Sequence, residues 1–296
     1  MTRAFQAITA EPWAIEPSWL PLLAAIASRN QSTPEFESAK DWQKRDFELM
    51  AGPAAQRLAG AHRTFVIDGV AVLPITGPIF PRANMMTEMS GATSISMLHN
   101  DYRAALDNKD IGAIMLLMDT PGGAVSGING FADAVAAGAQ KKYTVAHVAG
   151  SAASAGYWIA SAASEITMER TALVGSIGVV SAVPKQVEPD KNGEMLMEIV
   201  STNAPNKRPD PTTEDGRGEI VAVLDAIEQQ FIADVARGRK VSIEKVIADF
   251  GKGGVKVGKS AVSAGMADKV QSQEATLNGL RKLVANNRRL ETLRQR

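Results

Sequence analysis

Residues 111–123 read Ile-Gly-Ala-Ile-Met-Leu-Leu-Met-Asp-Thr-Pro-Gly-Gly. The first part, residues 111–118, is a continuous apolar run, which is typical of a strand buried on both faces in a parallel sheet. The second part, residues 119–123, is rich in glycine and predicts a turn directly after the strand. Because parallel strands need crossover connections, and helices usually supply them, this stretch favours an α/β fold.

The rest of the chain extends this alternation of strands and helices. Apolar runs predict a hairpin of two strands at 65–67 and 70–75 around an Asp68-Gly69 turn, and further strands at 143–148, 166–168 and 195–200. Helical patterns cover residues 95–106, 131–139, 154–163, 219–235 and 242–250, the last with Ser242 as its N-cap. Residues 82–94 and 201–210 are expected to be loops. The order of elements predicts an α/β architecture with crossovers.

Composition excludes several classes of function. The chain has 296 residues, of which 45% are hydrophobic and 22% are charged, as in ordinary globular proteins. Its 32 Lys and Arg balance 32 Asp and Glu, which argues against a nucleic-acid partner. It contains no cysteine and three histidines, so a thiol nucleophile is excluded and a histidine-rich metal site is not expected. We expect neither a cofactor nor a metal.

Two apolar segments could be taken for membrane or export signals. Residues 19–28 end in small side chains, but Arg3 is outnumbered by Glu11 and Glu16, the wrong charge balance for a signal peptide. Residues 143–164 are long enough to span a bilayer but contain many serines. We therefore expect no membrane partner and a cytoplasmic location.

Three regions of different character divide the chain. Residues 1–60 hold three of the four tryptophans among several prolines and form an expected arm, which docks either on the rest of this chain or on another chain. Residues 61–272 carry the strand and helix pattern. Residues 273–296 form an expected basic helical tail, which is either a solvated terminal helix or a helix that binds a partner.

Three local features could carry chemistry, and each has a plain structural alternative. The glycine pair at 122–123 could let the backbone approach a ligand, or it could simply end a strand. Ser154 stands at a predicted helix N-terminus, where free N–H groups favour negative charge, but a serine there could also be only a cap. Lys207 lies in a loop, where most lysines are solvated, although a desolvated lysine can accept a serine proton.

In combination, these features resemble the serine–lysine peptidases of the signal peptide peptidase A family, and specifically its bacteriophage head-maturation branch. The resemblance covers residues 64–270. It rests on four motifs in order, at 119–123, 150–158, 174–179 and 201–210, with residues 258–270 matching the closing region of the family. Residues 11–15 resemble the phage branch more than the membrane-bound bacterial enzymes.

The resemblance implies a role for each matching residue. Ser154 corresponds to the nucleophile and Lys207 to the general base, which later protonates the leaving amine. Ser176 corresponds to a hydroxyl that positions the lysine. The N–H groups of Gly123 and Ala155 correspond to the oxyanion hole.

The family also implies a crotonase-like and Clp-protease-like α/β superhelix, homo-oligomeric rings and active sites near subunit contacts. In some members the lysine comes from another domain or subunit, so whether Lys207 acts within its own chain stays open. The implied function is a serine endopeptidase that cleaves capsid, scaffold or portal proteins in the host cytoplasm or inside the assembling prohead.

Several alternatives remain beside this interpretation. Ser151 is the nearest rival nucleophile, but it precedes the matching turn by three positions. His147 is expected to be a core or strand-end histidine, because it lies on an apparent buried strand seven residues before Ser154. A Clp-like triad is disfavoured because the chain has no histidine downstream of Ser154. An acyl-CoA enzyme of crotonase type and a non-catalytic capsid assembly protein are the two other functional classes.

Overall fold

The computed structural model describes residues 12–21, 23, 55–82, 92–183, 188 and 199–294. The strands are β1 (Trp13–Ile15), β2 (Gln56–Arg57), β3 (Phe65–Ile67), β4 (Val70–Thr76), β5 (Ile79–Phe80), β6 (Thr93–Ser94), β7 (Ala113–Thr120), β8 (Gly122–Ala124), β9 (Tyr143–Ala153), β10 (Glu165–Met168), β11 (Leu173–Gly175), β12 (Val255–Val257) and β13 (Lys269–Val270). The helices are α5 (Ile95–Asp107), α6 (Ile128–Ala139), α7 (Ala155–Ser161), the short 3₁₀ helix η1 (Pro205–Lys207), α8 (Glu214–Arg239), α9 (Ile243–Asp249), α10 (Gly258–Ala264) and α11 (Gln273–Arg294).

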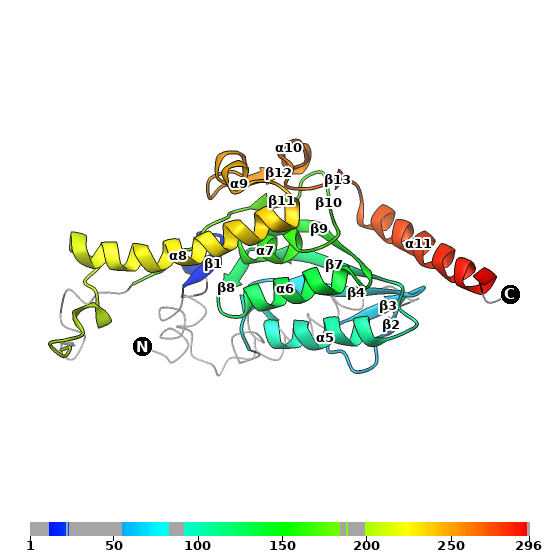
Figure 1. Ribbon diagram of the computed structural model, residues 1–296, viewed down its shortest axis with the longest axis horizontal. Coiled ribbons are helices and arrows are strands. Elements are labelled where there is room, and N and C mark those ends of the chain that lie inside the picture. Colours follow the sequence, from blue (N-terminus) through cyan, green and yellow to red (C-terminus); the bar gives the residue numbers. More distant parts are fainter. Residues whose placement is uncertain are drawn as a thin grey trace.

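A mixed sheet forms the centre of the molecule (Figure 1). Its strand order is β12-β11-β9-β7-β4-β3-β2, and β10 pairs with both β9 and β13. The neighbouring strands β4, β7 and β9 run parallel, as do β10 and β11 against β9, which confirms the predicted α/β fold. The predicted hairpin is also confirmed, since β3 and β4 are antiparallel around Asp68 and Gly69, whose φ angles of 49° and 80° suit a two-residue turn.

Both faces of this sheet are covered by helices. Successive side chains of a strand point to opposite faces, so Leu73 and Leu116 face the core beneath α5, α6 and α7. Their neighbours Met115 and Leu117 face the other way, where Leu280 of α11 packs. This double burial explains why residues 111–118 are apolar without alternation. The tail expected at 273–296 is thus helical in its described part and covers one face of the sheet.

A second, smaller sheet lies at the carboxyl end of β7, in the order β1-β8-β5-β6. β8 pairs in parallel with β5 and antiparallel with β1, which belongs to the expected arm. The sequence predicted none of these strands. The loop prediction for 82–94 was wrong at β6, which pairs with β5, while residues 83–91 lie outside the described residues. Strands of two or three residues carry too short a pattern to be recognised.

Two other strands differ from the prediction, whereas one helix boundary agrees with it. β9 extends through Ala153, beyond the expected end at residue 148, because pairing with β11 continues its ladder. The strand expected at 195–200 falls outside the described residues except for 199–200, which are not in a strand. Ser242 caps α9 as predicted, since its side chain accepts a hydrogen bond from the Lys245 N–H.

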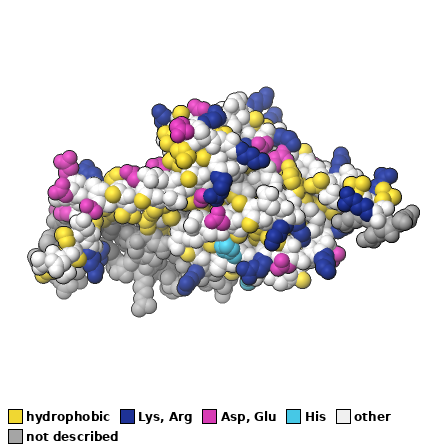
Figure 2. Space-filling view, viewed as in Figure 1, with side chains coloured by type: hydrophobic (Ala, Val, Ile, Leu, Met, Phe, Trp, Pro, Cys, Tyr) yellow, Lys and Arg dark blue, Asp and Glu magenta, His cyan; other side chains and the backbone are white. Residues whose placement is uncertain are grey.

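α8 is longer than predicted and only its second half is buried. Thr213 caps its start by accepting a hydrogen bond from the Gly216 N–H. Phe231 and Val235 are buried in the core, whereas Val221 and Val223 of the first half are 43% and 56% exposed. Figure 2 shows apolar side chains along this projecting helix. The first half of α8 therefore extends away from the core without covering it.

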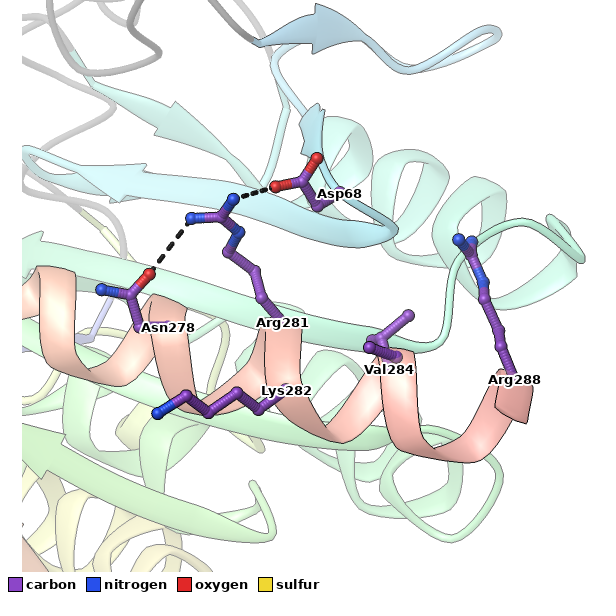
Figure 3. A pocket seen from close by; sticks show the side chains of 7 residues that line it. Asp68, Asn278, Arg281, Lys282, Val284 and Arg288 are labelled. Carbon is purple, nitrogen blue, oxygen red and sulfur yellow. Dashed lines mark hydrogen bonds and ion pairs between the residues drawn. The ribbon is translucent and has the colours of Figure 1, made fainter. Parts of the chain in front are cut away.

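α11 is held as far as Arg288 by apolar contacts and by charged groups. Figure 3 shows Arg281 reaching from α11 to Asp68 in the β3–β4 turn and to Asn278 one turn earlier on the same helix. Arg288 donates a hydrogen bond to the Asp110 carbonyl at 2.6 Å. These groups line a cavity of about 580 Å³ beside the hairpin. Among the described residues, no helix combines the length and the apolar character that crossing a bilayer requires.

Candidate active site

Ser154 lies where β9 passes into α7, and its backbone is strained. It has φ 52° and ψ −117°, a backbone conformation that residues other than glycine rarely adopt. Hydrogen bonds hold it there: the Ser154 N–H donates to the Gly175 carbonyl at 2.7 Å, and its carbonyl accepts from the Trp158 N–H at 3.0 Å. Such strain persists only where the surrounding structure enforces it, and it is found most often at functional sites.

The Ser154 side chain is fully buried and lies at the amino end of α7. The side chain Oγ donates a long hydrogen bond of 3.4 Å to the Gly178 carbonyl. The first N–H groups of a helix, here beginning at Ala155, have no acceptor within the helix and carry partial positive charge. A negative charge that developed beside Ser154 would therefore be stabilised.

The glycine pair after β7 lies directly against Ser154. A Cβ atom on Gly122 would stand 3.0 Å from the Ser154 Cβ and 2.2 Å from the Ala14 carbonyl oxygen, and one on Gly123 would stand 2.0 Å from the Ile79 carbonyl oxygen. Only glycine allows this approach of backbone to backbone. Thr120 supports the turn, because its Oγ1 donates to the Gly77 carbonyl at 2.7 Å and accepts from the Gly122 N–H at 3.2 Å.

Ser176 belongs to the same group of residues. Its strand β11 pairs with β9 so that Gly175 stands opposite Ala153, one residue before Ser154. Ser176 is 6% exposed, has a φ of 54°, and donates its N–H to the Gly254 carbonyl at 2.8 Å. The fold thus gathers Ser154, Ala155, Ser176 and Gly123 at the carboxyl ends of β9, β11 and β7.

Lys207 is not gathered with them in this chain. It ends η1, is exposed, and donates its backbone N–H to the Ala204 carbonyl. Figure 1 shows the segment 199–213, which precedes α8, beyond the amino end of that helix, whereas α7 lies at the centre of the molecule. The residue matched to the base therefore lies on a projection, away from the serine.

The two other candidates from the sequence occupy different surroundings. Ser151 lies within β9, and its N–H donates to the Asp119 carboxylate at 3.0 Å, while its buried Oγ has no hydrogen-bond partner in the described part of the chain. His147 is fully buried, and its Nδ1 lies 2.9 Å and 3.1 Å from the hydroxyls of Thr167 and Thr276. Burial lowers the pKa of His147 to about 4. The prediction of a core histidine is confirmed.

The sequence placed Gly178 and Ala14 within motifs but indicated no role for either, and it did not single out Val180. The Gly178 carbonyl accepts the hydrogen bond from the Ser154 Oγ. The Ala14 carbonyl oxygen lies against Gly122, and Val180 pairs with Trp13, the residue before Ala14. These groups act through backbone atoms, which leave no residue-type signal. Within the described ranges, no three His, Asp or Glu side chains are grouped so that they could hold a metal ion.

The sequence matches a known protein family and is similar to proteins of two phages. Residues 136–287 match peptidase family S49. The capsid assembly protease C of Escherichia phage lambda is 30% identical over 73% of this chain and 49% of its own length. The head-tail preconnector protein GP5 of Enterobacteria phage P21 is 23% identical over 96% of this chain and 58% of its own length. The chain thus spans about half the length of these two relatives.

Among solved structures, a membrane-bound stomatin-specific protease in complex with a substrate peptide matches 68% of this chain and 74% of its own. The TM-score is 0.41 and the sequence identity is 17%.

Proposed function

Because the chain belongs to peptidase family S49, we propose that it is a serine endopeptidase in which Ser154 attacks the peptide bond and Lys207 takes up its proton. One observation carries the proposal. Ser154 is held in a strained conformation at the amino end of α7, against a glycine pair that leaves room only for backbone. This arrangement presents a hydroxyl to a site with N–H groups on two sides.

The reaction follows the usual two steps of a serine peptidase. The Ser154 Oγ bonds to the carbonyl carbon while its proton passes to the Lys207 Nζ. The Gly123 and Ala155 N–H groups stabilise the oxyanion. Lys207 then protonates the departing amine, and water hydrolyses the acyl-enzyme by the reverse sequence of proton transfers.

Lys207 reaches Ser154 from a neighbouring copy of the chain. Two features support this assignment: η1 is exposed at the end of a projection, and the helix α8 that follows it carries the exposed side chains Val221 and Val223. A projecting segment with an apolar face is typical of a surface that packs on another protein. A heterologous contact of this kind closes into a ring if its rotation allows.

Ser176 positions the lysine in the assembled site. Ser176 is buried and lies one residue beyond β11, whose last residue Gly175 stands opposite Ala153, the residue before Ser154. A hydroxyl there can accept a hydrogen bond from an incoming ammonium group and hold it toward the serine. Ser176 is therefore a positioning residue.

The substrates are capsid, scaffold or portal proteins, and cleavage takes place during assembly of a phage head, in the host cytoplasm or inside the prohead. The relatives from phages lambda and P21, which are described as a capsid assembly protease and a head-tail preconnector protein, support this proposal.

The direct test follows intact masses over time for the wild type and for Ser154→Ala, Lys207→Ala and Ser176→Ala, each mixed with an unfolded protein. We expect fragments from the wild type, none from Ser154→Ala and Lys207→Ala, and slower release of fragments from Ser176→Ala. Circular dichroism and thermal unfolding of each variant serve as the folding control. Cleavage by Ser154→Ala at the rate of the wild type would indicate that Ser151 is the nucleophile. Normal turnover by Lys207→Ala would contradict the dyad.

A further inference from the structure

The strand β1 fills the strip between two backbone segments that flank Ser154. On one edge it pairs antiparallel with β8, so that Trp13, Ala14 and Ile15 stand opposite Ala124, Gly123 and Gly122. On the other edge, Trp13 and Val180 exchange two hydrogen bonds of 2.8 Å each. We call this strip, bounded by β8 and Val180, the peptide site. An extended chain in it is bonded through its backbone on both sides, the way in which strand-binding proteins hold a peptide.

The register places the Ala14 carbonyl beside the nucleophile. The Val125 N–H donates to the Pro12 carbonyl at 3.2 Å, and the Glu16 N–H donates to the Pro121 carbonyl at 2.8 Å. Hydrogen-bonded pairs alternate along an antiparallel ladder, so the pair between these two, Ala14 and Gly123, is also hydrogen-bonded. The Gly123 N–H therefore points at the Ala14 carbonyl. That N–H is the one proposed above to stabilise the oxyanion.

Side chains anchor β1 as well as its backbone. Trp13 and Ile15 are each 2% exposed and share an apolar cluster with Phe80 and Ala124. The ring of Trp13 meets that of Phe80 edge to face, with 5.7 Å between the centroids. Ala14 points the other way, into the main core that also contains Ala152 and Ala155. The peptide site thus accommodates a small side chain at the position of Ala14 and an aromatic one just before it.

We propose that β1 is an internal peptide bound at the substrate site, and that it blocks Ser154 until it leaves. The inference rests on the proposed function, because it uses Ser154 and Gly123 in their proposed roles. It explains why the Ser154 side chain has no exposed surface. A substrate then binds as an extended strand in place of β1, with a small residue where Ala14 lies and a large apolar one before it.

An engineered disulfide tests the proposal in one protein. The pair Trp13 and Ala124 is a non-hydrogen-bonded antiparallel pair, whose close Cα atoms suit a disulfide. Because the chain has no cysteine, Trp13→Cys with Ala124→Cys introduces the only thiols. The matched control is Val66→Cys with Ala71→Cys, the equivalent pair in the β3–β4 hairpin. Labelling of Ser154 by a fluorophosphonate probe and cleavage of an unfolded protein are measured before and after reduction.

We expect reduction of the Trp13 and Ala124 pair to speed both labelling and cleavage by about tenfold or more, since the competent fraction of molecules rises when β1 is released. Reduction of the control pair should leave both rates unchanged. Equal rates for the oxidised and reduced forms of the first variant would overturn the proposal while leaving the peptidase intact.

A binding measurement separates failure of the proposal from failure of the function. In the Ser154→Ala background, a fluorescent peptide with the sequence of residues 11–17 should bind the reduced form of the disulfide variant and not the oxidised form. Binding of this kind without any cleavage by the reduced enzyme would retain the peptide site and reject the peptidase. Equal binding by both forms would reject β1 as the occupant of the site.

Discussion

At the residue scale, the glycine pair and Ser154 depend on one another. Gly122 has a φ of 103°, in the left-handed region, and its Cα faces the Ala14 carbonyl and the Ser154 Cβ. A Cβ atom at this position would clash with backbone atoms, which cannot move aside as the end of a flexible side chain can. Gly122 is therefore required for the close approach of Ala14 and Ser154, because even the methyl group of an alanine would not fit between them.

Gly122→Ala is expected to lower the free energy of unfolding by about 1–3 kcal/mol and to abolish cleavage, because the added Cβ is strained and displaces the Ser154 region. Urea unfolding and the intact-mass assay measure the two effects. Gly130→Ala is the matched control, since nothing lies within 4 Å of its Cβ position on α6. That substitution should stabilise the protein by up to about 1 kcal/mol and leave cleavage unchanged. Full activity of Gly122→Ala would contradict the proposed geometry.

His147 is a second residue whose environment has a measurable consequence. Its Nδ1 joins Thr167 of β10 and Thr276 of α11, so it connects three elements inside the core. Its Nε2 lies 3.9 Å from the Glu169 carboxylate. Burial outweighs the attraction of that carboxylate and lowers the pKa of His147 from 6.5 to about 4.

The stability of the protein should therefore fall as the pH is lowered from 6.5 to 4. In this window the unfolded chain binds a proton at His147 that the folded chain does not, which costs the folded state about 3 kcal/mol by pH 4. Urea unfolding at several pH values checks the slope. His147→Gln removes the titrating group and should give a shallower slope in the same window. Identical slopes for the two proteins would show that His147 is not the group responsible.

At the scale of elements, α11 and α8 each pack on the rest of the fold along only part of their length. On α11, Leu280 and Val284 are buried against the sheet, and Leu290 and Leu293 are 53% and 57% exposed. On α8, the apolar spacing predicted from the sequence continues along the helix, but only the Phe231 and Val235 end packs on the core. Helical periodicity identifies an apolar face and does not say what covers it.

Two leucines on α11 make a matched pair for testing which half of the helix stabilises the fold. Leu280→Ala should lower the free energy of unfolding by about 2–5 kcal/mol, because it leaves a cavity under the sheet. Leu290→Ala should change it by less than about 0.5 kcal/mol, since that side chain lies mostly in solvent. Urea unfolding of both variants gives the comparison. Similar losses for the two would mean that the second half of α11 is also buried in solution.

At the scale of the whole molecule, the projection that carries Lys207 lies apart from the site that contains Ser154, which is why we propose a dyad formed between copies. Ser154→Ala and Lys207→Ala, each inactive alone, should then recover activity when they are co-expressed. Random pairing restores roughly a quarter of the sites, because a working site needs the intact serine of one variant and the intact lysine of the other. The intact-mass assay measures the recovery.

The matched control for this experiment co-expresses Ser154→Ala with the double variant Ser154→Ala/Lys207→Ala, which has no intact serine and should stay inactive. Native mass spectrometry establishes that mixed oligomers have formed. Mixed oligomers without recovered activity would place Lys207 in the site of its own chain and contradict the proposed exchange.

The sequence by itself determined the α/β class, the long strands and helices, and the residues that could carry chemistry. Buried parallel strands and amphipathic helices have strong local patterns, and residues 111–118 and the 219–235 spacing are examples. Ser154, Ser176 and Gly123 became candidates because they match motifs of the family that the sequence resembles. His147 was assigned to the core because it lies on an apolar strand.

Only the tertiary structure decided that Ser154, Ser176 and the glycine pair meet at one edge of the sheet, that Lys207 projects away from them, and that β1 lies in the peptide site. The small sheet of β1, β8, β5 and β6 left no pattern in the sequence, because strands of two or three residues are held by pairing and not by periodicity. Contacts between backbone atoms far apart in the chain depend on register, which emerges only when the whole chain is folded.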